Sequence, residues 1–194
     1  MTDLLKYTPQ LKQPGAVGVI PTDTIYGLAA RAADKAATER LYALKNRENK
    51  PGTIIAADLK QLEELGLKHR YLKAVEQFWP ASLSVIIPCG DPALRYLHRG
   101  KMSLAIRIPD HKNLQKLLQA TGPLLTSSVN YPGEPPAETI EQAKAYFGQK
   151  VDFYADGGNL AGHQPSTIIR IVDDAIEVLR QGAVKIDETG RRQT

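Results

Sequence analysis

Hydrophobic positions along the chain follow two patterns, short β-branched runs and stripes that recur at helical spacing. The runs predict strands, and the stripes predict amphipathic helices. Strands are expected at residues 16–20, 52–57, 83–88, 103–109, 123–130, 151–155, 166–172 and 176–182. Helices are expected at residues 34–44, 59–65, 70–79, 111–122 and 139–148. Strands and helices therefore intermix along the whole chain, which predicts an α/β or α+β fold.

Polar residues and glycine mark the expected ends of these helices. Asp58 and Thr139 stand at N-cap positions, and Gly122 stands where a helix should end. The apolar stripe of the helix at 34–44 consists of Ala33, Ala37, Leu41 and Leu44. The last strands follow one another through tight turns, so part of the sheet is expected to be antiparallel.

The length of 194 residues fits a single domain, expected to span residues 1–194 with its core from about 14 to 186. The last residues, from Asp187, are expected to be flexible. Residues 1–15 lack the apolar run of a signal peptide, and no stretch reaches the roughly 18 apolar residues of a membrane span. The single cysteine, Cys89, excludes an internal disulfide. We therefore expect a cytoplasmic protein with no membrane partner.

The formal net charge of +4 favours anionic partners such as nucleotides, phosphates or RNA, although surface lysines alone would also account for it. No phosphate-binding P-loop occurs, and "GGNLAG" at 157–162 does not fit a dinucleotide fingerprint. The four histidines show no metal-ligand spacing, so no protein-held metal site is expected. A phosphorylated ligand would therefore have to be bound without the common cradles.

Polar clusters stand at the ends of the expected strands, where ligands bind in open α/β sheets. The stretch from Val19 to Pro51 has a threonine-rich turn before its helix and a cationic run after it. The cluster residues are Thr22, Asp23 and Thr24; Lys45, Arg47 and Lys50; Arg107; Thr126, Ser127, Ser128 and Asn130; Ser166 and Thr167; and Arg180. Most of them also have an ordinary structural explanation as turn formers, caps or partners of the helix dipole.

Arg107 is the exception, because it interrupts an otherwise apolar strand. Alternation places it with Ala105 on one face, and puts Leu104, Ile106 and Ile108 on the core face. We therefore expect Arg107 to line a cavity as an unpaired cation that an anionic ligand satisfies. On that expectation, replacing Arg107 by leucine leaves the fold at least as stable.

The clusters together indicate one kind of chemistry. A guanidinium binds a carboxylate or phosphate through two parallel hydrogen bonds, and several cations in one short segment suit a triphosphate. No residues resemble a covalent nucleophile with its base. This favours catalysis by positioning and charge stabilisation, as in phosphoryl and nucleotidyl transfer.

Six motifs carry a resemblance to a known family. "PTDTIYGL" resembles the PT[ED]TxYGL signature of the YrdC-like threonylcarbamoyl-AMP synthases, and "KNR" with the following "KP" resembles that family's K-x-R segment. "SVN" at 128–130 resembles its S-x-N motif. "RIPDH", "PSTII" and "LRQGAV" are similar to the family in order and approximate spacing, so the resemblance runs from about Gly18 to Val184.

The resemblance implies a twisted, open mixed sheet flanked by helices around a large basic cavity. It implies a single-domain L-threonylcarbamoyladenylate synthase that uses ATP, L-threonine and bicarbonate, with Mg²⁺ bound through ATP. The product would feed a threonylcarbamoyl transferase complex that modifies tRNA. By the same resemblance, Thr24, Arg107, Thr126 and Ser166 bind threonine, Lys45 and Arg47 are catalytic, and Lys45, Arg47, Lys50, Ser128, Asn130 and Arg180 bind ATP.

The chain departs from the family pattern on the ATP side. "PASLS" at 80–84 lacks a usual glycine, "YPG" follows the S-x-N motif, and the loop to Pro51 is about one residue short. Two other functions stay open at this stage. One is a non-catalytic protein that binds double-stranded RNA or tRNA, or acts in ribosome maturation. The other is a carbamoyl-transfer relative that acts on a different amine or hydroxyl.

Overall fold

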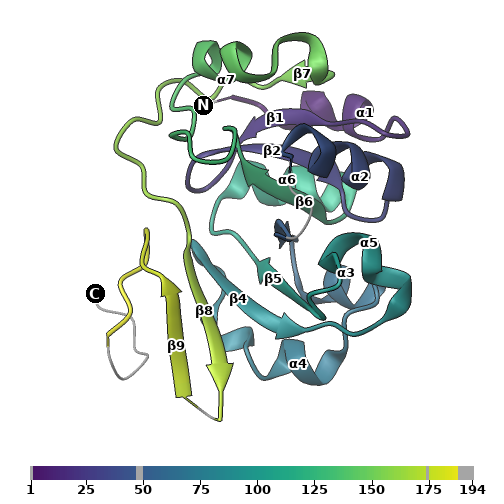
Figure 1. The fold of residues 1–194 in the computed structure, drawn as a ribbon, viewed down its shortest axis with the longest axis vertical. Coiled ribbons are helices and arrows are strands. Elements are labelled where there is room, and N and C mark those ends of the chain that lie inside the picture. The colour runs from purple at the N-terminus through teal and green to yellow at the C-terminus, as the bar shows by residue number, and fades with distance from the viewer. Residues whose placement is uncertain (1, 47–49, 174, 188–194) are drawn as a thin grey trace.

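The computed structural model describes residues 2–46, 50–173 and 175–187. These residues form a mixed α/β fold around one twisted, nine-stranded sheet of order β7-β1-β2-β6-β3-β5-β4-β8-β9 (Figure 1). The strands are β1 (Gly18–Pro21), β2 (Tyr26–Arg31), β3 (Thr53–Ile55), β4 (Leu83–Pro88), β5 (Ser103–Arg107), β6 (Leu124–Ser128), β7 (Phe153–Tyr154), β8 (Thr167–Val172) and β9 (Ala175–Arg180). The tail predicted to be flexible lies, beyond Asp187, outside the described residues.

The sheet is mixed, as the tight turns between the late strands predicted. Strands β8 and β9 form an antiparallel hairpin at one end of the sheet. Parallel pairs join β1 to β7, β3 to β5 and β4 to β8. The other neighbours run antiparallel. Strands that are distant in sequence therefore meet in the middle of the sheet, where their ends can build one site.

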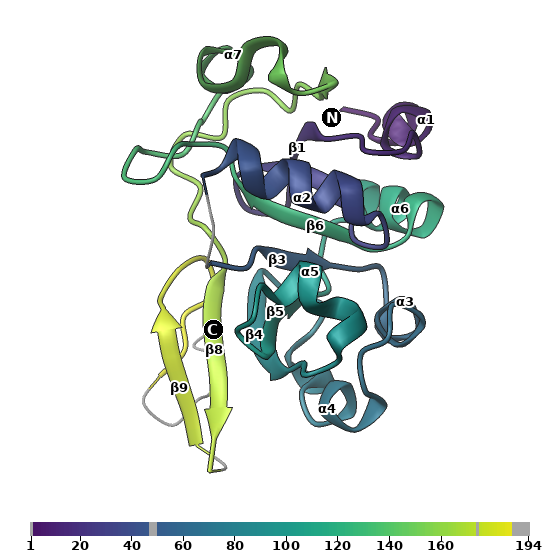
Figure 2. The same ribbon diagram turned by 45° about the vertical axis from the view of Figure 1, so that its right-hand side comes forward.

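The helices cover two faces of the sheet. They are α1 (Thr8–Leu11), α2 (Lys35–Leu44), α3 (Leu59–Glu64), α4 (His69–Lys73), α5 (Arg95–His98), α6 (Lys112–Thr121) and α7 (Ile140–Phe147). Residues of α2, α3, α4, α5 and α7 share one hydrophobic cluster with the sheet, whereas α1 and α6 share a second (Figure 2). In β2, Leu28 belongs to the first cluster and its neighbour Ala29 to the second, as strand alternation requires.

Strand β2 was missed by the sequence analysis, which placed only a turn between residue 20 and the next helix. Its residues Gly27, Ala29 and Ala30 are small and have little preference for strands. The strand forms because it is buried between β1 and β6, with Leu28 opposite Val19 on one side and Ser127 on the other. The threonine-rich turn is consequently the tip of a β1–β2 hairpin.

Other expectations met mixed outcomes. The predicted caps are confirmed, since Asp58 accepts from the Gln61 amide, Thr139 from the Gln142 amide, and Gly122 ends α6. The helix expected at 70–79 is wrong in its second half. It ends at Lys73, because Val75 leaves the helical region with φ of −122° before a short 3₁₀ turn.

Two further details differ from the sequence analysis. Helix α5 was not predicted, and Ala33, assigned to the apolar stripe of α2, is exposed and precedes the helix. Among the described residues, no helix has the length and apolar character that crossing a bilayer demands.

Asp152 fastens β7 and α2 to the start of β1. Its Oδ2 accepts hydrogen bonds from the Val17 amide at 2.8 Å and from Arg40 Nη1 at 2.6 Å. Burial by itself would raise the pKa of Asp152, but the hydrogen bonds from Arg40 and Val17 outweigh burial and lower the pKa. The folded state therefore favours the charged carboxylate.

We predict that Asp152→Ala lowers the free energy of unfolding by about 1–2 kcal/mol at pH 7, because its partly exposed carboxylate accepts three hydrogen bonds, from Val17 and Arg40, and all three are lost. A lowered folded-state pKa stabilises the fold above the unfolded value of about 3.9, and this contribution disappears as pH falls through the folded value. Urea unfolding at pH 7 and pH 3 should thus show a difference that shrinks in acid. Glu64→Gln, in an exposed pair with Lys60, serves as the control and should change stability by less than about 0.5 kcal/mol. A difference that grows in acid would contradict the assignment.

Candidate active site

A cavity of about 140 Å³ opens where the ends of several strands converge. Its walls come from the β1–β2 turn, the start of β3, the ends of β5, β6 and β9, and the segment that enters β8. The lining residues are Thr22, Thr24, Ile25, Tyr26, Gly27, Pro51, Gly52, Thr53, Arg107, Thr126, Ser127, Ser128, Pro165, Ser166, Ile168 and Arg180. Hydroxyl groups and backbone atoms dominate this surface, so it suits a small polar ligand.

Most residues that the sequence nominated meet at this cavity. They are Thr24, Arg107, Thr126, Ser128, Ser166 and Arg180. Lys45 and Asn130 do not line the cavity but contact its lining residue Ser128. Lys50 is exposed and precedes the lining residue Pro51 in the chain, and Arg47 lies outside the described residues. The lining carries Arg107 and Arg180 as its cationic side chains among the described residues, so the large basic cavity that the resemblance implied is not shown.

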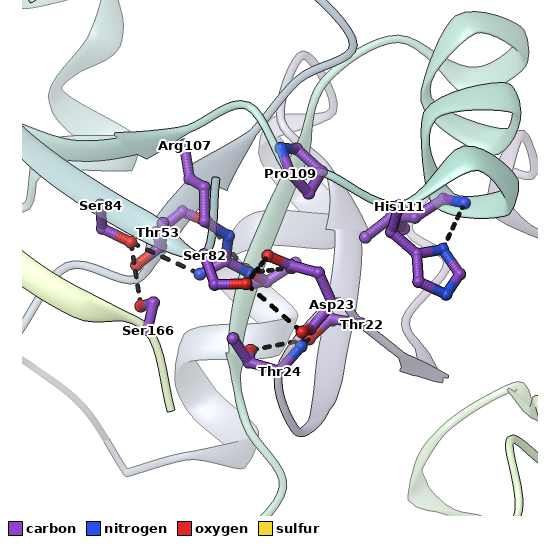
Figure 3. A network of polar contacts seen from close by, with 12 residues as sticks. Thr22, Asp23, Thr24, Thr53, Ser82, Ser84, Arg107, Pro109, His111 and Ser166 are labelled. Carbon is purple, nitrogen blue, oxygen red and sulfur yellow. Dashed lines mark hydrogen bonds and ion pairs between the residues drawn. The ribbon is translucent and has the colours of Figure 1, made fainter. Parts of the chain in front are cut away.

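The threonine-rich turn holds its own shape. Thr22 Oγ1 donates to the Ile25 carbonyl at 2.7 Å and accepts from the Thr24 amide at 3.2 Å. The hydroxyls of Thr22 and Thr24 lie 3.0 Å apart, and both side chains are buried. Thr22 is thus a turn former, and the turn it builds points Thr24 at the cavity (Figure 3).

Arg107 lines the cavity as alternation predicted, while Leu104, Ile106 and Ile108 pack in the core. Its expected lack of a partner is wrong. Arg107 Nη2 lies 3.0 Å from Asp23 Oδ1, and both side chains are almost completely buried, at 5% and 2% exposed (Figure 3). Burial lowers the pKa of Arg107, and the charge of Asp23 opposes that change. The sequence could not supply this partner, because Asp23 is 84 positions away in the chain.

Three serines connect the far side of the cavity to this ion pair. Ser82 Oγ donates to Asp23 Oδ2 at 2.8 Å, and Arg107 Nη1 lies 3.4 Å from Ser84 Oγ. Ser84 in turn lies 3.0 Å from the hydroxyl of Ser166. The sequence analysis named Asp23 in a polar cluster without giving it a role, and it missed Ser82 and Ser84. The signal available was weak: Asp23 belongs to the quoted motif, and Ser84 is a lone hydroxyl in an apolar strand.

Arg180 braces the segment that enters β8. Its Nε and Nη2 donate to the Ser166 carbonyl at 3.0 and 2.7 Å, and Nη2 also reaches the Ser166 hydroxyl at 3.1 Å. The antiparallel hairpin of β8 and β9 brings Arg180 opposite Ile168. Arg180 therefore fixes Ser166 at the cavity while its own side chain stays exposed to solvent.

Lys45 is fully buried at the end of α2 and points at the end of β6. Its Nζ donates to the Ser128 carbonyl at 2.7 Å, to Asn130 Oδ1 at 2.7 Å and to the Asn130 carbonyl. These three acceptors match the three protons of an ammonium. Ser128 Oγ donates to the same amide oxygen of Asn130 at 2.7 Å. Lys45 thus holds the S-x-N segment in place in this structure.

The loop after Asn130, which departs from the family pattern, is anchored on α7. The Tyr131 ring packs 5.2 Å from that of Phe147, and its hydroxyl donates to the Tyr146 carbonyl at 2.9 Å. Asn130 Nδ2 donates to the Glu134 carbonyl at 2.6 Å. The unusual tyrosine therefore fixes the loop that continues from the S-x-N segment.

Metal ligands do not gather at this site. Among the residues that the structure describes, no group of three or more His, Cys, Asp or Glu side chains could hold a metal ion.

Comparisons with known proteins agree on the identity of this fold. The Sua5/YciO/YrdC family model, described as telomere recombination, matches residues 10–182. A threonylcarbamoyl-AMP synthase of Chromohalobacter salexigens is 38% identical over 159 residues, which cover 79% of this chain and 85% of that protein.

Solved structures show the same similarity. P. abyssi Sua5 in complex with L-threonine superposes with a TM-score of 0.80 at 27% identity, over 92% of this chain. This chain spans 54% of that longer protein. E. coli YciO superposes with a TM-score of 0.78 at 25% identity, over 95% of this chain and 91% of its own.

We predict that Arg107→Leu destabilises the fold, contrary to the expectation from the sequence. The substitution leaves Asp23 as a buried, uncompensated carboxylate, which costs about 3–5 kcal/mol. Adding Asp23→Asn in the same chain removes the stranded charge, so the double variant should recover part of that loss. Thermal or urea unfolding of the single and double variants measures both values. If Arg107→Leu alone matches the unchanged chain in stability, the ion pair contributes nothing to the fold.

Proposed function

Because the chain belongs to the Sua5/YciO/YrdC family, we propose that it is a threonylcarbamoyl-AMP synthase. It would convert L-threonine, bicarbonate and ATP into L-threonylcarbamoyl-AMP and pyrophosphate. The observation that carries this proposal is a buried arginine aimed into a cavity lined with hydroxyls, in a chain whose structural relative from P. abyssi was solved with L-threonine.

Threonine would be bound by the inner part of the cavity. The guanidinium of Arg107 would bind the carboxylate of threonine. The Nε atom of Arg107 has no hydrogen-bond partner among the described residues. Thr24, Thr126 and Ser166 supply neutral hydroxyls around the same space, which can orient the amino and hydroxyl groups of the substrate.

The chemistry needs no covalent enzyme intermediate. The threonine nitrogen attacks the carbon of bicarbonate and water leaves, which gives a carbamate. A carbamate oxygen then attacks the α-phosphorus of ATP, and pyrophosphate leaves. The protein would contribute orientation and charge stabilisation to both steps, which accounts for a site without a nucleophile and base.

ATP would lie toward the β6 end and the loop after α2. Besides Lys45, the family resemblance assigns five residues to the nucleotide. The structure describes four of them, Ser128, Asn130, Arg180 and Lys50, whereas Arg47 lies outside the described residues. The catalytic assignment of Lys45 needs refinement, since its protons are directed at Ser128 and Asn130. We assign Lys45 the role of holding that nucleotide-binding segment. Mg²⁺ would enter with ATP, held by phosphates and water.

The product would be consumed by a threonylcarbamoyl transferase that modifies tRNA. The alternative of a non-catalytic RNA-binding or ribosome-maturation protein is not favoured, because the similar proteins are named as synthases. Transfer to a different amine or hydroxyl would predict no special requirement for threonine.

We predict that pyrophosphate release from ATP requires both L-threonine and bicarbonate, with serine a poor substitute because it lacks a methyl group worth about 1–3 kcal/mol in a fitted pocket. A coupled pyrophosphate assay with each component omitted measures the requirement. Equal turnover without any amino acid would refute the synthase assignment.

Arg107→Lys keeps the charge but loses the planar guanidinium that can donate two parallel hydrogen bonds. The substitution should therefore raise the KM for threonine far more than the KM for ATP.

Lys45 and Lys50 provide a matched pair for the nucleotide side. Lys45→Met should lower the free energy of unfolding by about 1.5–3 kcal/mol, because buried carbonyl oxygens lose a charged donor. Lys50→Met should leave stability unchanged and weaken ATP binding about fivefold, through the loss of about 1 kcal/mol of attraction in water. Urea unfolding and ATP titration calorimetry separate the two effects. Unchanged stability in Lys45→Met would show that Lys45 is not a structural clamp.

A further inference from the structure

Asp23 is a buried carboxylate at the proposed threonine site that has no assigned role. It lies in the β1–β2 turn, between Thr22 and Thr24, and reaches across to β5 and to the residue before β4 (Figure 3). Its Oδ2 accepts from Ser82 at 2.8 Å, and its Oδ1 lies 3.0 Å from Arg107 Nη2. Ser82 is itself held in place by a hydrogen bond of 3.2 Å from the Thr167 amide to the Ser82 carbonyl.

Asp23 contacts the guanidinium of Arg107 at one end, through Oδ1 and Nη2. Asp23 Oδ1 and Arg107 Nε are both buried, and neither has a hydrogen-bond partner among the described residues. The Nη1 contact with Ser84 is long, at 3.4 Å. Asp23 therefore neutralises the buried cation while the guanidinium retains N–H donors for a ligand.

The charge balance of the site favours one class of ligand. With Asp23 and Arg107 together neutral, a plain carboxylate would bring an uncompensated negative charge into a buried space, which is unfavourable. A zwitterionic amino acid brings its own ammonium group and leaves the net charge unchanged. The pair can thus bind a carboxylate through Arg107 and still discriminate against simple acids.

We propose that Asp23 is a positioning residue that orients Arg107 toward the substrate carboxylate and makes the site select a zwitterionic amino acid over a plain carboxylate. This inference rests on the proposed function, because it takes threonine as the ligand.

The test compares the binding of L-threonine with that of 3-hydroxybutyrate, which has the same hydroxyl and methyl groups but no ammonium. Calorimetric titration of Asp23→Asn should show threonine binding weakened about 10- to 100-fold, the loss expected for one charge-assisted contact. The preference for threonine over 3-hydroxybutyrate should fall about tenfold, because the variant site carries a net positive charge. Threonine binding that is unchanged or tighter in Asp23→Asn, or an unchanged preference, overturns the proposal.

Two further variants keep the result interpretable. Asp58→Asn alters a carboxylate that caps α3, where asparagine caps equally well, and should leave both ligands unaffected. Ser82→Ala keeps the charge of Asp23 but removes its clamp, so threonine should bind about three- to tenfold more weakly with the preference unchanged. If Asp23→Asn does not fold, Ser82→Ala decides, and normal threonine binding in it refutes the positioning role.

Failure of the proposed function gives a different result. If the unchanged chain binds no threonine, the synthase assignment fails, and the positioning role is then read from Arg107 directly. Proton exchange at the Arg107 guanidinium N–H groups, followed by nuclear magnetic resonance, should be about tenfold faster in Asp23→Asn, or in Ser82→Ala if the first variant does not fold, because the contact of Nη2 with Asp23 is lost or loosened. An equal exchange rate overturns the inference independently of any ligand.

Discussion

The buried ion pair between Asp23 and Arg107 is the interaction on which the site depends. Arg107 is at the end of a central strand, where its side chain is almost completely buried. An arginine stays protonated even when it is buried. A carboxylate must accompany it, and the β1–β2 turn delivers one. The ion pair therefore ties the turn to β5, and the geometry of the cavity follows from this one connection.

Most other residues that line the cavity are uncharged. Its walls offer threonine and serine hydroxyls and backbone atoms, which orient a ligand without adding charge. Such a site accepts the zwitterion of an amino acid, and its neutral hydrogen bonds allow the ammonium group to lose its proton before the nitrogen reacts. The reaction that we propose asks for this property, since the nitrogen must attack bicarbonate.

A second buried cation, Lys45, organises the end of β6, where we propose that the nucleotide binds. Lys45, at the C-terminal end of α2, donates hydrogen bonds to the carbonyl oxygens of Ser128 and Asn130 and so connects the helix to strand β6. Tyr42, one turn earlier, accepts from the Gly52 amide at 3.1 Å and donates to the Leu97 carbonyl at 2.8 Å. Tyr42 thus holds Gly52, which lines the cavity together with Pro51.

The sequence by itself determined the fold class and the helix caps at Asp58 and Thr139, because hydrophobic period and local capping act over a few residues. Its motifs also named part of the group that lines the cavity, including Thr24, Thr126 and Ser166. It also placed Arg107 on the cavity face, since strand alternation is a local rule. Strand β2 could not be read from its small residues, because its extended form comes from burial between β1 and β6. The partner of Arg107 and the direction of Lys45 were decided only by the tertiary structure. Both depend on electrostatic contacts between residues far apart in the chain, and no periodicity in the sequence records which buried charge will meet which oxygen.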